Sequence, residues 1–72
     1  MVIICRQDEQ GRSAGTTYIM KAAPDEETLK RILEEECGEG RLEIRGDGRV
    51  NYYGDRYYTY ITSEKRYYVI AS

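Results

Sequence analysis

The chain has 72 residues, with 13 acidic residues, 11 basic residues and no histidine, so its formal net charge is −2. This length allows one domain, and a domain so small buries only about 60% of the surface of its unfolded chain. The lack of histidine excludes Ser-His and Cys-His catalysis and histidine zinc sites, and two cysteines are too few for a zinc finger. We therefore expect a non-enzymatic protein without a metal or other cofactor.

The location of the protein is predicted from its apolar runs. Only four apolar residues in a row follow Met1, and no run approaches the ~18–20 residues of a membrane span. We expect a cytoplasmic protein without a membrane partner. Cys5 and Cys37 are expected to be buried free thiols, and the alternative of a Cys5–Cys37 disulfide is left open by their spacing.

The first half of the chain predicts two strands and one helix. Residues 2–6 and 16–22 are expected to pair as a hairpin across a polar loop. A helix is expected over residues 24–37, with Pro24 and three acids in its first turn and Gly38 after its end. The apolar stripe of this helix repeats at helical spacing and consists of Leu29, Ile32, Leu33 and Cys37.

After Gly40 the apolar period changes from helical to alternating, which predicts four more strands. Their expected ranges are 41–45, 49–53, 56–62 and 65–71. The element order is then β-β-α-β-β-β-β. The predicted fold class is α+β, with a single helix packed on an antiparallel sheet of five or six strands.

The expected turns at residues 46–48 and 54–55 define which side chains share a face. One face is predicted to be apolar and covered by the helix, with Leu42, Ile44, Val50, Tyr52, Tyr57 and Ile61. The opposite face is predicted to carry Glu43, Arg45, Arg49, Asn51, Tyr53, Arg56, Tyr58, Tyr60 and Thr62. In the last strand, either Tyr67 or Tyr68 points outward.

Tyrosine and arginine on this opposite face are the first candidate site. The chain has eight tyrosines and neither phenylalanine nor tryptophan, and seven of the tyrosines lie in residues 52–68. Tyr and Arg are enriched at protein–protein hot spots, and the same pair also stacks on single-stranded nucleic acid. The predicted protein-binding residues are Tyr53, Tyr58, Tyr60, Arg45, Arg49 and Arg56. A purely structural role for these tyrosines is the alternative.

Glutamates at the end of the predicted helix are the second candidate site. Residues 24–39 hold seven acids against two bases. Glu34, Glu35 and Glu36 lie at the negative end of the helix dipole, where acids are mildly unfavourable. They predict a secondary acidic surface that would dock on a basic partner, and a solvated helix face is the alternative.

The layout of the chain resembles that of small phage-encoded anti-CRISPR proteins, in particular a type I-F inhibitor with one helix on an antiparallel sheet. The resemblance covers the order of elements: a short strand pair, a helix ending near Cys37, and a glycine-punctuated meander. It implies binding to a Cas protein or complex and a block of target-DNA recognition. No binding residue carries over, because the resemblance involves no shared sequence motif.

The function expected from these observations is a protein–protein interaction module, in particular an inhibitor that binds a larger protein or ribonucleoprotein that handles nucleic acid. Direct binding of single-stranded nucleic acid by the Tyr/Arg face is a first alternative, which the net charge of −2 disfavours. A de novo designed domain without natural function is a second, because DEETLKRILEEE reads like a designed helix.

Overall fold

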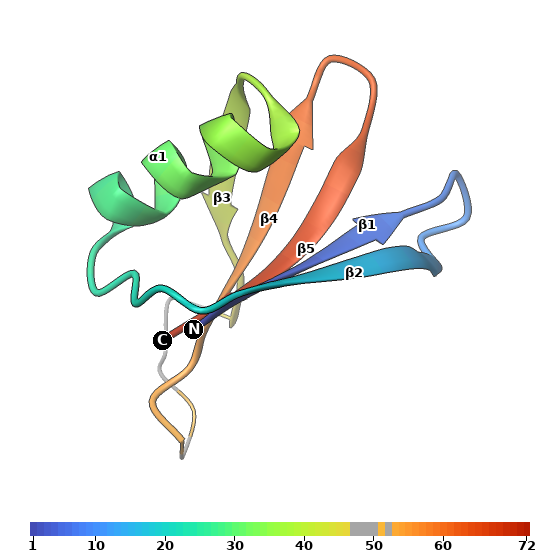
Figure 1. The fold of residues 1–72 in the computed structure, drawn as a ribbon. Coiled ribbons are helices and arrows are strands. Elements are labelled where there is room, and N and C mark those ends of the chain that lie inside the picture. Colours follow the sequence, from blue (N-terminus) through green and yellow to red (C-terminus); the bar gives the residue numbers. More distant parts are fainter. Residues whose placement is uncertain (47–50, 52) are drawn as a thin grey trace.

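The computed structural model describes residues 1–46, 51 and 53–72. Their elements, in chain order, are β1 (Val2–Gln7), β2 (Ser13–Ile19), α1 (Glu26–Cys37), β3 (Gly40–Ile44), β4 (Arg56–Thr62) and β5 (Arg66–Ala71). The strands form an antiparallel sheet in the order β2-β1-β5-β4-β3. The helix lies across one face of this sheet (Figure 1). The α+β prediction is confirmed, with the smaller of the two expected numbers of strands in the described residues.

The helix begins where a side chain can cap it. Asp25 has extended backbone angles, and its Oδ1 accepts a hydrogen bond of 2.7 Å from the Thr28 N–H. This bond lowers the pKa of Asp25. The helix therefore starts two residues after the predicted Pro24. It ends at Cys37 as predicted, because Gly38 adopts a φ of 91° that favours glycine.

The hairpin of β1 and β2 is confirmed, although β2 begins and ends three residues earlier than predicted. Asp8 explains the early start. Its Oδ1 accepts hydrogen bonds from the Gln10 and Arg12 N–H groups, both 2.9 Å long, which close a compact turn. The chain is therefore ready to pair with β1 from Ser13 onward.

The segment between β3 and β4 differs from the prediction. Arg45 N–H donates to the Tyr57 carbonyl over 3.0 Å, which extends the pairing of β3 directly with β4. Asn51 and Tyr53 are not in a strand. The Asn51 Oδ1 instead accepts from the Tyr53 and Asp55 N–H groups, at 2.9 and 2.8 Å. The other members of the predicted strand 49–53, Arg49, Val50 and Tyr52, lie outside the described residues.

Direct pairing of β3 with β4 inverts the predicted faces of β4. Leu42 lies opposite Tyr60, and Ile44 lies opposite Tyr58. Tyr58 and Tyr60 therefore face α1 and are 2% and 0% exposed. The prediction that Tyr57 and Ile61 face the helix is wrong. Side chains alternate along a strand, so a register that differs by an odd number of residues places each side chain on the other face of the sheet.

The core lies between α1 and the sheet. Its buried residues are Val2, Ile4, Ala23, Leu29, Leu33, Tyr58, Tyr60, Tyr67, Val69 and Ala71. Tyr67 is the inward member of the Tyr67–Tyr68 pair. Ile32 and Leu42 pack at the margin of the core, whereas Ile44, expected in the core, is mostly exposed. Cys5 and Cys37 are both free and half-buried. The described residues contain no helix long and apolar enough to cross a membrane.

Buried tyrosines make the stability of this fold sensitive to alkali. Burial raises the pKa of Tyr58, Tyr60 and Tyr67 above the ordinary value of 10.0. The folded state therefore holds these protons more tightly than the unfolded state. We expect the contribution of these tyrosines to the free energy of unfolding to be fully present below about pH 10 and to be lost as the pH rises further. Urea unfolding across this range measures the effect, and constant stability to the end of the tyrosine titration would contradict it.

Candidate functional site

Half of the predicted Tyr/Arg site lies on the helix side of the sheet. Tyr58 and Tyr60 are buried under α1. Arg56, on the same face of β4, donates a hydrogen bond from its guanidinium to the Ala23 carbonyl, and its Cζ lies 5.8 Å from the centroid of the Tyr58 ring. The Arg56 hydrogen bond holds the segment before α1 against the sheet. Tyr58 and Tyr60 have too little exposed surface to bind a partner.

The other predicted residues do not form a common surface with them. Arg45 lies on the face of the sheet away from α1, as predicted. Tyr53 is 81% exposed but lies in the turn before β4 rather than on the sheet. Arg49 lies outside the described residues. Of the predicted set, Arg45 is thus the described member placed on the sheet face opposite the helix.

That face, which we call the open face, carries an apolar row across four strands. Ile3 of β1 lies opposite Tyr18 of β2 on one side and Ile70 of β5 on the other, and Ile70 lies opposite Tyr57 of β4. Alternation along the strands turns all four side chains away from α1. In the part of the chain that the structure describes, no element covers this row.

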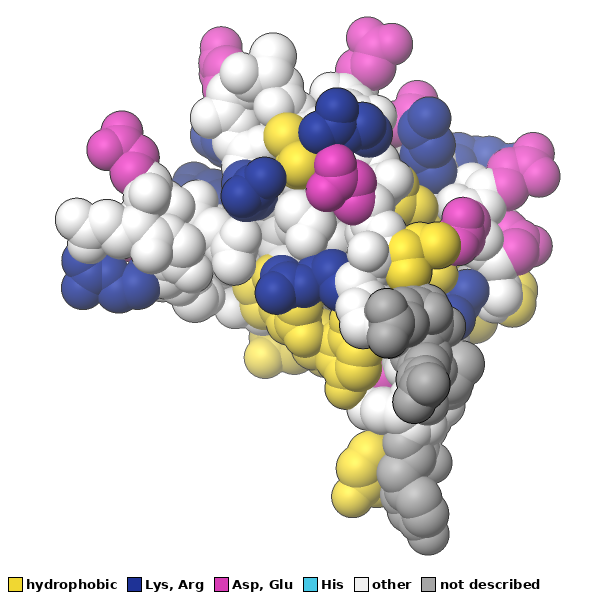
Figure 2. Space-filling view, turned by 180° about the vertical axis from the view of Figure 1, so that it is seen from behind, with side chains coloured by type: hydrophobic (Ala, Val, Ile, Leu, Met, Phe, Trp, Pro, Cys, Tyr) yellow, Lys and Arg dark blue, Asp and Glu magenta, His cyan; other side chains and the backbone are white. Residues whose placement is uncertain are grey.

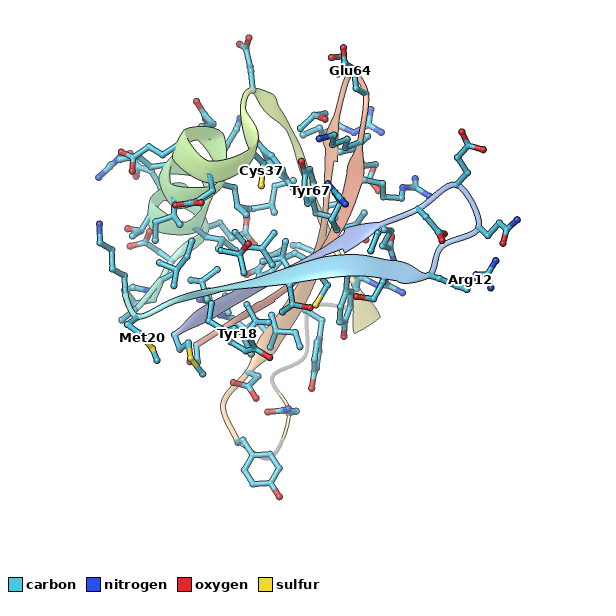
Figure 3. All side chains as sticks on the ribbon, turned by 45° about the vertical axis from the view of Figure 1, so that its right-hand side comes forward. Arg12, Tyr18, Met20, Cys37, Glu64 and Tyr67 are labelled. Atoms are coloured by element: carbon cyan, nitrogen blue, oxygen red, sulfur yellow. The ribbon has the colours of Figure 1, made fainter. Side chains whose placement is uncertain are left out.

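Two methionines extend the row at the end of the sheet where the chain termini lie. Met1 precedes the core residue Val2, and Met20 follows Ile19, which packs against the core, so both alternate onto the open face. Met20 and Tyr18 are 83% and 63% exposed. Figure 3 shows both on the side of β2 away from α1. We call the following residues the open-face patch: Met1, Ile3, Tyr18, Met20, Tyr57, Tyr68 and Ile70.

Arginine and asparagine side chains fix the tyrosines at one end of this patch. The rings of Tyr57 and Tyr68 are stacked, with centroids 6.2 Å apart. The Arg45 Cζ lies 4.8 Å from the centroid of the Tyr68 ring, and the Asn51 Nδ2 donates to the Tyr57 hydroxyl over 2.5 Å. Burial raises the pKa of Tyr68, although nearby Arg45 acts to lower it. The two rings are thus held in place rather than free to turn.

Charged side chains lie next to this patch on the open face. A hollow of about 360 Å³ lies beyond the tyrosines, toward the turn between β1 and β2. Its lining includes three carboxylates and two guanidiniums, from Asp8, Glu9, Glu43, Arg45 and Arg66. Figure 2 shows hydrophobic side chains gathered on this side of the molecule, with basic side chains next to them. The open face therefore combines an apolar end with an end of mixed charge.

The predicted acidic surface is exposed on α1. Glu34, Glu35 and Glu36 are all exposed in the last turns of the helix. They face solvent on the opposite side of the molecule from the open-face patch. The described residues contain no group of three or more His, Cys, Asp or Glu side chains placed to hold a metal ion.

No protein family, curated protein or solved structure was found to match this chain. Tyr18 and Met20 were not predicted as site residues, although they alternate in the sequence with the inward-facing Ile19. The sequence does not show which strands the 12-residue helix covers. In the structure the helix leaves β2 uncovered, and residues Ser13–Tyr18 of this strand are all exposed.

Proposed function

We propose that this chain is a non-enzymatic interaction module that binds a larger protein through the open-face patch. The observation that carries the proposal is the row Tyr18–Ile3–Ile70–Tyr57, flanked by Met1 and Met20. Apolar side chains that adjoin on a small domain are costly to leave in water, and such patches mark interaction sites. Methionine and tyrosine are enriched in the cores of protein interfaces.

The geometry favours a protein over single-stranded nucleic acid as the partner. A base needs a free ring face on which to stack, and Arg45 occupies one face of Tyr68 while Tyr57 lies beside it. A phosphate backbone needs a consistently basic path, but carboxylates of Asp8, Glu9 and Glu43 line the hollow next to the tyrosines. Single-stranded nucleic acid is therefore the second candidate.

The class of partner that we propose is a nucleic-acid-handling protein or ribonucleoprotein, which the chain would inhibit by occupying one of its surfaces. The resemblance to anti-CRISPR proteins implies this class. The exposed Glu34, Glu35 and Glu36 add support, because such partners present basic surfaces that attract an acidic ridge. These glutamates would speed association, whereas the open-face patch would provide most of the affinity.

Two tyrosines of similar exposure test the position of the interface. We expect Tyr18→Ala to weaken partner binding by about 2 kcal/mol or more, as at a hot spot, without lowering the melting temperature. Tyr53→Ala is the matched control, because it removes the same side chain from an exposed position outside the patch. Affinity and thermal unfolding are measured on both variants. Loss of binding with Tyr53→Ala alone would place the interface at the turn before β4.

The two cysteines provide a second readout within one molecule. Cys5 lies on the open face, paired with Tyr68 and Thr16, whereas Cys37 lies at the end of α1. Burial raises the pKa of Cys37, although its hydrogen bond with Tyr67 acts to lower it. Because Cys5 is on the open face and Cys37 is not, a bound partner is expected to slow alkylation of Cys5 relative to the free protein. The rate of alkylation at Cys37 should stay unchanged. Protection of Cys37 alone would argue for the helix side.

Fluorescence anisotropy with labelled single-stranded DNA and RNA, at two salt concentrations, decides between the two candidate functions. Binding that is tight and falls steeply with salt would make single-stranded nucleic acid the first candidate partner and protein the second. Weak binding to both probes, together with loss of a protein partner in Tyr18→Ala, supports the interaction module.

A further inference from the structure

The two edges of the sheet differ in how they are protected against a further strand. β3 is short and presents Arg41 and Glu43, which form an ion pair of 2.9 Å. Charged side chains on an edge strand oppose pairing with another chain. β2 has the sequence SAGTTYI, with neither a charge nor a proline. Within the described ranges, no strand pairs with the outer side of β2.

β2 is accessible from more than its edge. Residues Ser13–Tyr18 are all exposed, and a hollow of about 340 Å³ separates β2 from the C-terminal end of α1. This hollow is lined by Thr16 and Thr17 of β2 and by Glu36 and Cys37 of the helix. Figure 1 shows β1 and β2 extending away from the helix. An added strand would therefore meet no obstacle on either face.

β2 pairs regularly with β1 over the residues that an added strand would contact. The register with β1 slips only next to Gln7, near the start of β2. From Gly15 to Ile19 the residues pair one to one with β1. This stretch can present a regular outer row of backbone N–H and C=O groups to a partner.

We propose that the outer edge of β2 binds an extended segment of the partner protein, which adds to the sheet as an antiparallel strand. The segment is uncharged along Gly15–Ile19 and carries a carboxylate at its N-terminal end, beside Lys21. Lys21 is exposed, lies two residues after the end of β2, and forms no ion pair within the part of the chain that the structure describes. Tyr18 and Met20 would contact the side chains of this segment on the open face.

Charge argues against a second copy of this chain as the occupant. An antiparallel pair of β2 strands that overlap fully would bring Lys21 of each copy close to Arg12 of the other. The ion pair of Arg12 with Asp8, over 3.8 Å, is exposed and therefore weak. Arg12 lies at the opposite end of β2 from Met20 (Figure 3). Like charges facing each other across strands are unfavourable, and the symmetric pair would contain two such contacts.

This inference rests on the proposed function, because it names the kind of segment that the partner contributes. The probe is a short synthetic peptide with a glutamate followed by alternating threonine and valine. One control peptide has lysine in place of the glutamate, and another has methylated backbone nitrogens at alternate positions. Amide hydrogen exchange of the full chain, followed by NMR, reports which strand is protected.

With the glutamate peptide at ten times its dissociation constant, we expect exchange at alternate amides of residues 15–19 to slow by about tenfold. Lys21→Glu should weaken binding of this peptide by about three- to tenfold and strengthen binding of the lysine peptide. Lys30 is exposed on α1, away from β2, so Lys30→Glu makes the same change of charge and should alter the affinity for neither peptide. Equal binding of the methylated peptide, no protection at millimolar peptide, or protection at β3 instead would overturn the proposal.

Two further results keep this inference separate from the proposed function. Protection of β2 that grows with protein concentration, without peptide, would replace the partner segment by a second copy and overturn the inference. Ile70→Thr alters the open-face patch far from the edge, so it should still bind the peptide while losing the partner. Retained partner binding in Ile70→Thr and Tyr18→Ala would refute the proposed function, even where the peptide result holds.

Discussion

Replacing Tyr60 by alanine is expected to remove much of the stability of the fold. Tyr60 has the largest of the fully buried side chains, and its hydroxyl donates to the Gly38 carbonyl over 2.7 Å. Truncation of a buried aromatic ring costs about 3–5 kcal/mol. A domain of this length has about 4–11 kcal/mol in all. Urea unfolding should therefore show a large loss, with part of the population unfolded in water if the starting stability is low.

Tyr60→Phe is the matched control for this prediction. It keeps the ring in the core and removes only the hydrogen bond to Gly38, the residue that follows α1. Its expected cost is about 1 kcal/mol. An alanine variant that loses no more than the phenylalanine variant would show that the ring contributes nothing to the packing.

Leu33→Ala is expected to have the second largest effect, a loss of about 2–5 kcal/mol in the free energy of unfolding. The side chain of Leu33 points from α1 toward the sheet and is fully buried. Ile32 is the neighbouring control, because it packs at the margin of the core and is half-buried. Ile32→Ala should cost clearly less, and equal losses at the two positions would contradict the observed orientation of the helix.

The helix and most strand bounds could be predicted because their signals are local. Gly38 marks the C-terminal end of α1, and the apolar stripe with Leu29 and Leu33 defines its buried side; the Asp25 cap places the start two residues after the predicted one. The range of β4 was predicted without error. These features depend on residues close together in the chain, so neither the order of strands nor the pairing register was needed to find them.

The faces of β4 could not be predicted, because its sequence RYYTYIT carries apolar side chains on both. Tyr57 and Ile61 would make an acceptable core face, and so would Tyr58 and Tyr60. Only the pairing partner decides between them, and this depends on the conformation of the segment between β3 and β4. Since tyrosine is compatible with core and surface alike, composition does not resolve the choice. For this reason the candidate site stays on the face away from the helix, but its β4 tyrosine is Tyr57 rather than Tyr58 and Tyr60.

The adjacency of the two chain ends has a mechanical consequence. The Met1 carbonyl accepts from the Ser72 N–H over 3.1 Å, and Val2 lies opposite Ala71 in the pairing of β1 with β5. These central strands are antiparallel, so their hydrogen bonds lie across the strands and in line with a force that pulls the ends apart. Such a force would load one residue pair at a time, from Val2–Ala71 toward Gln7–Arg66. The molecule should therefore unzip under low tension through the middle of its sheet, separating the β1–β2 hairpin from the rest.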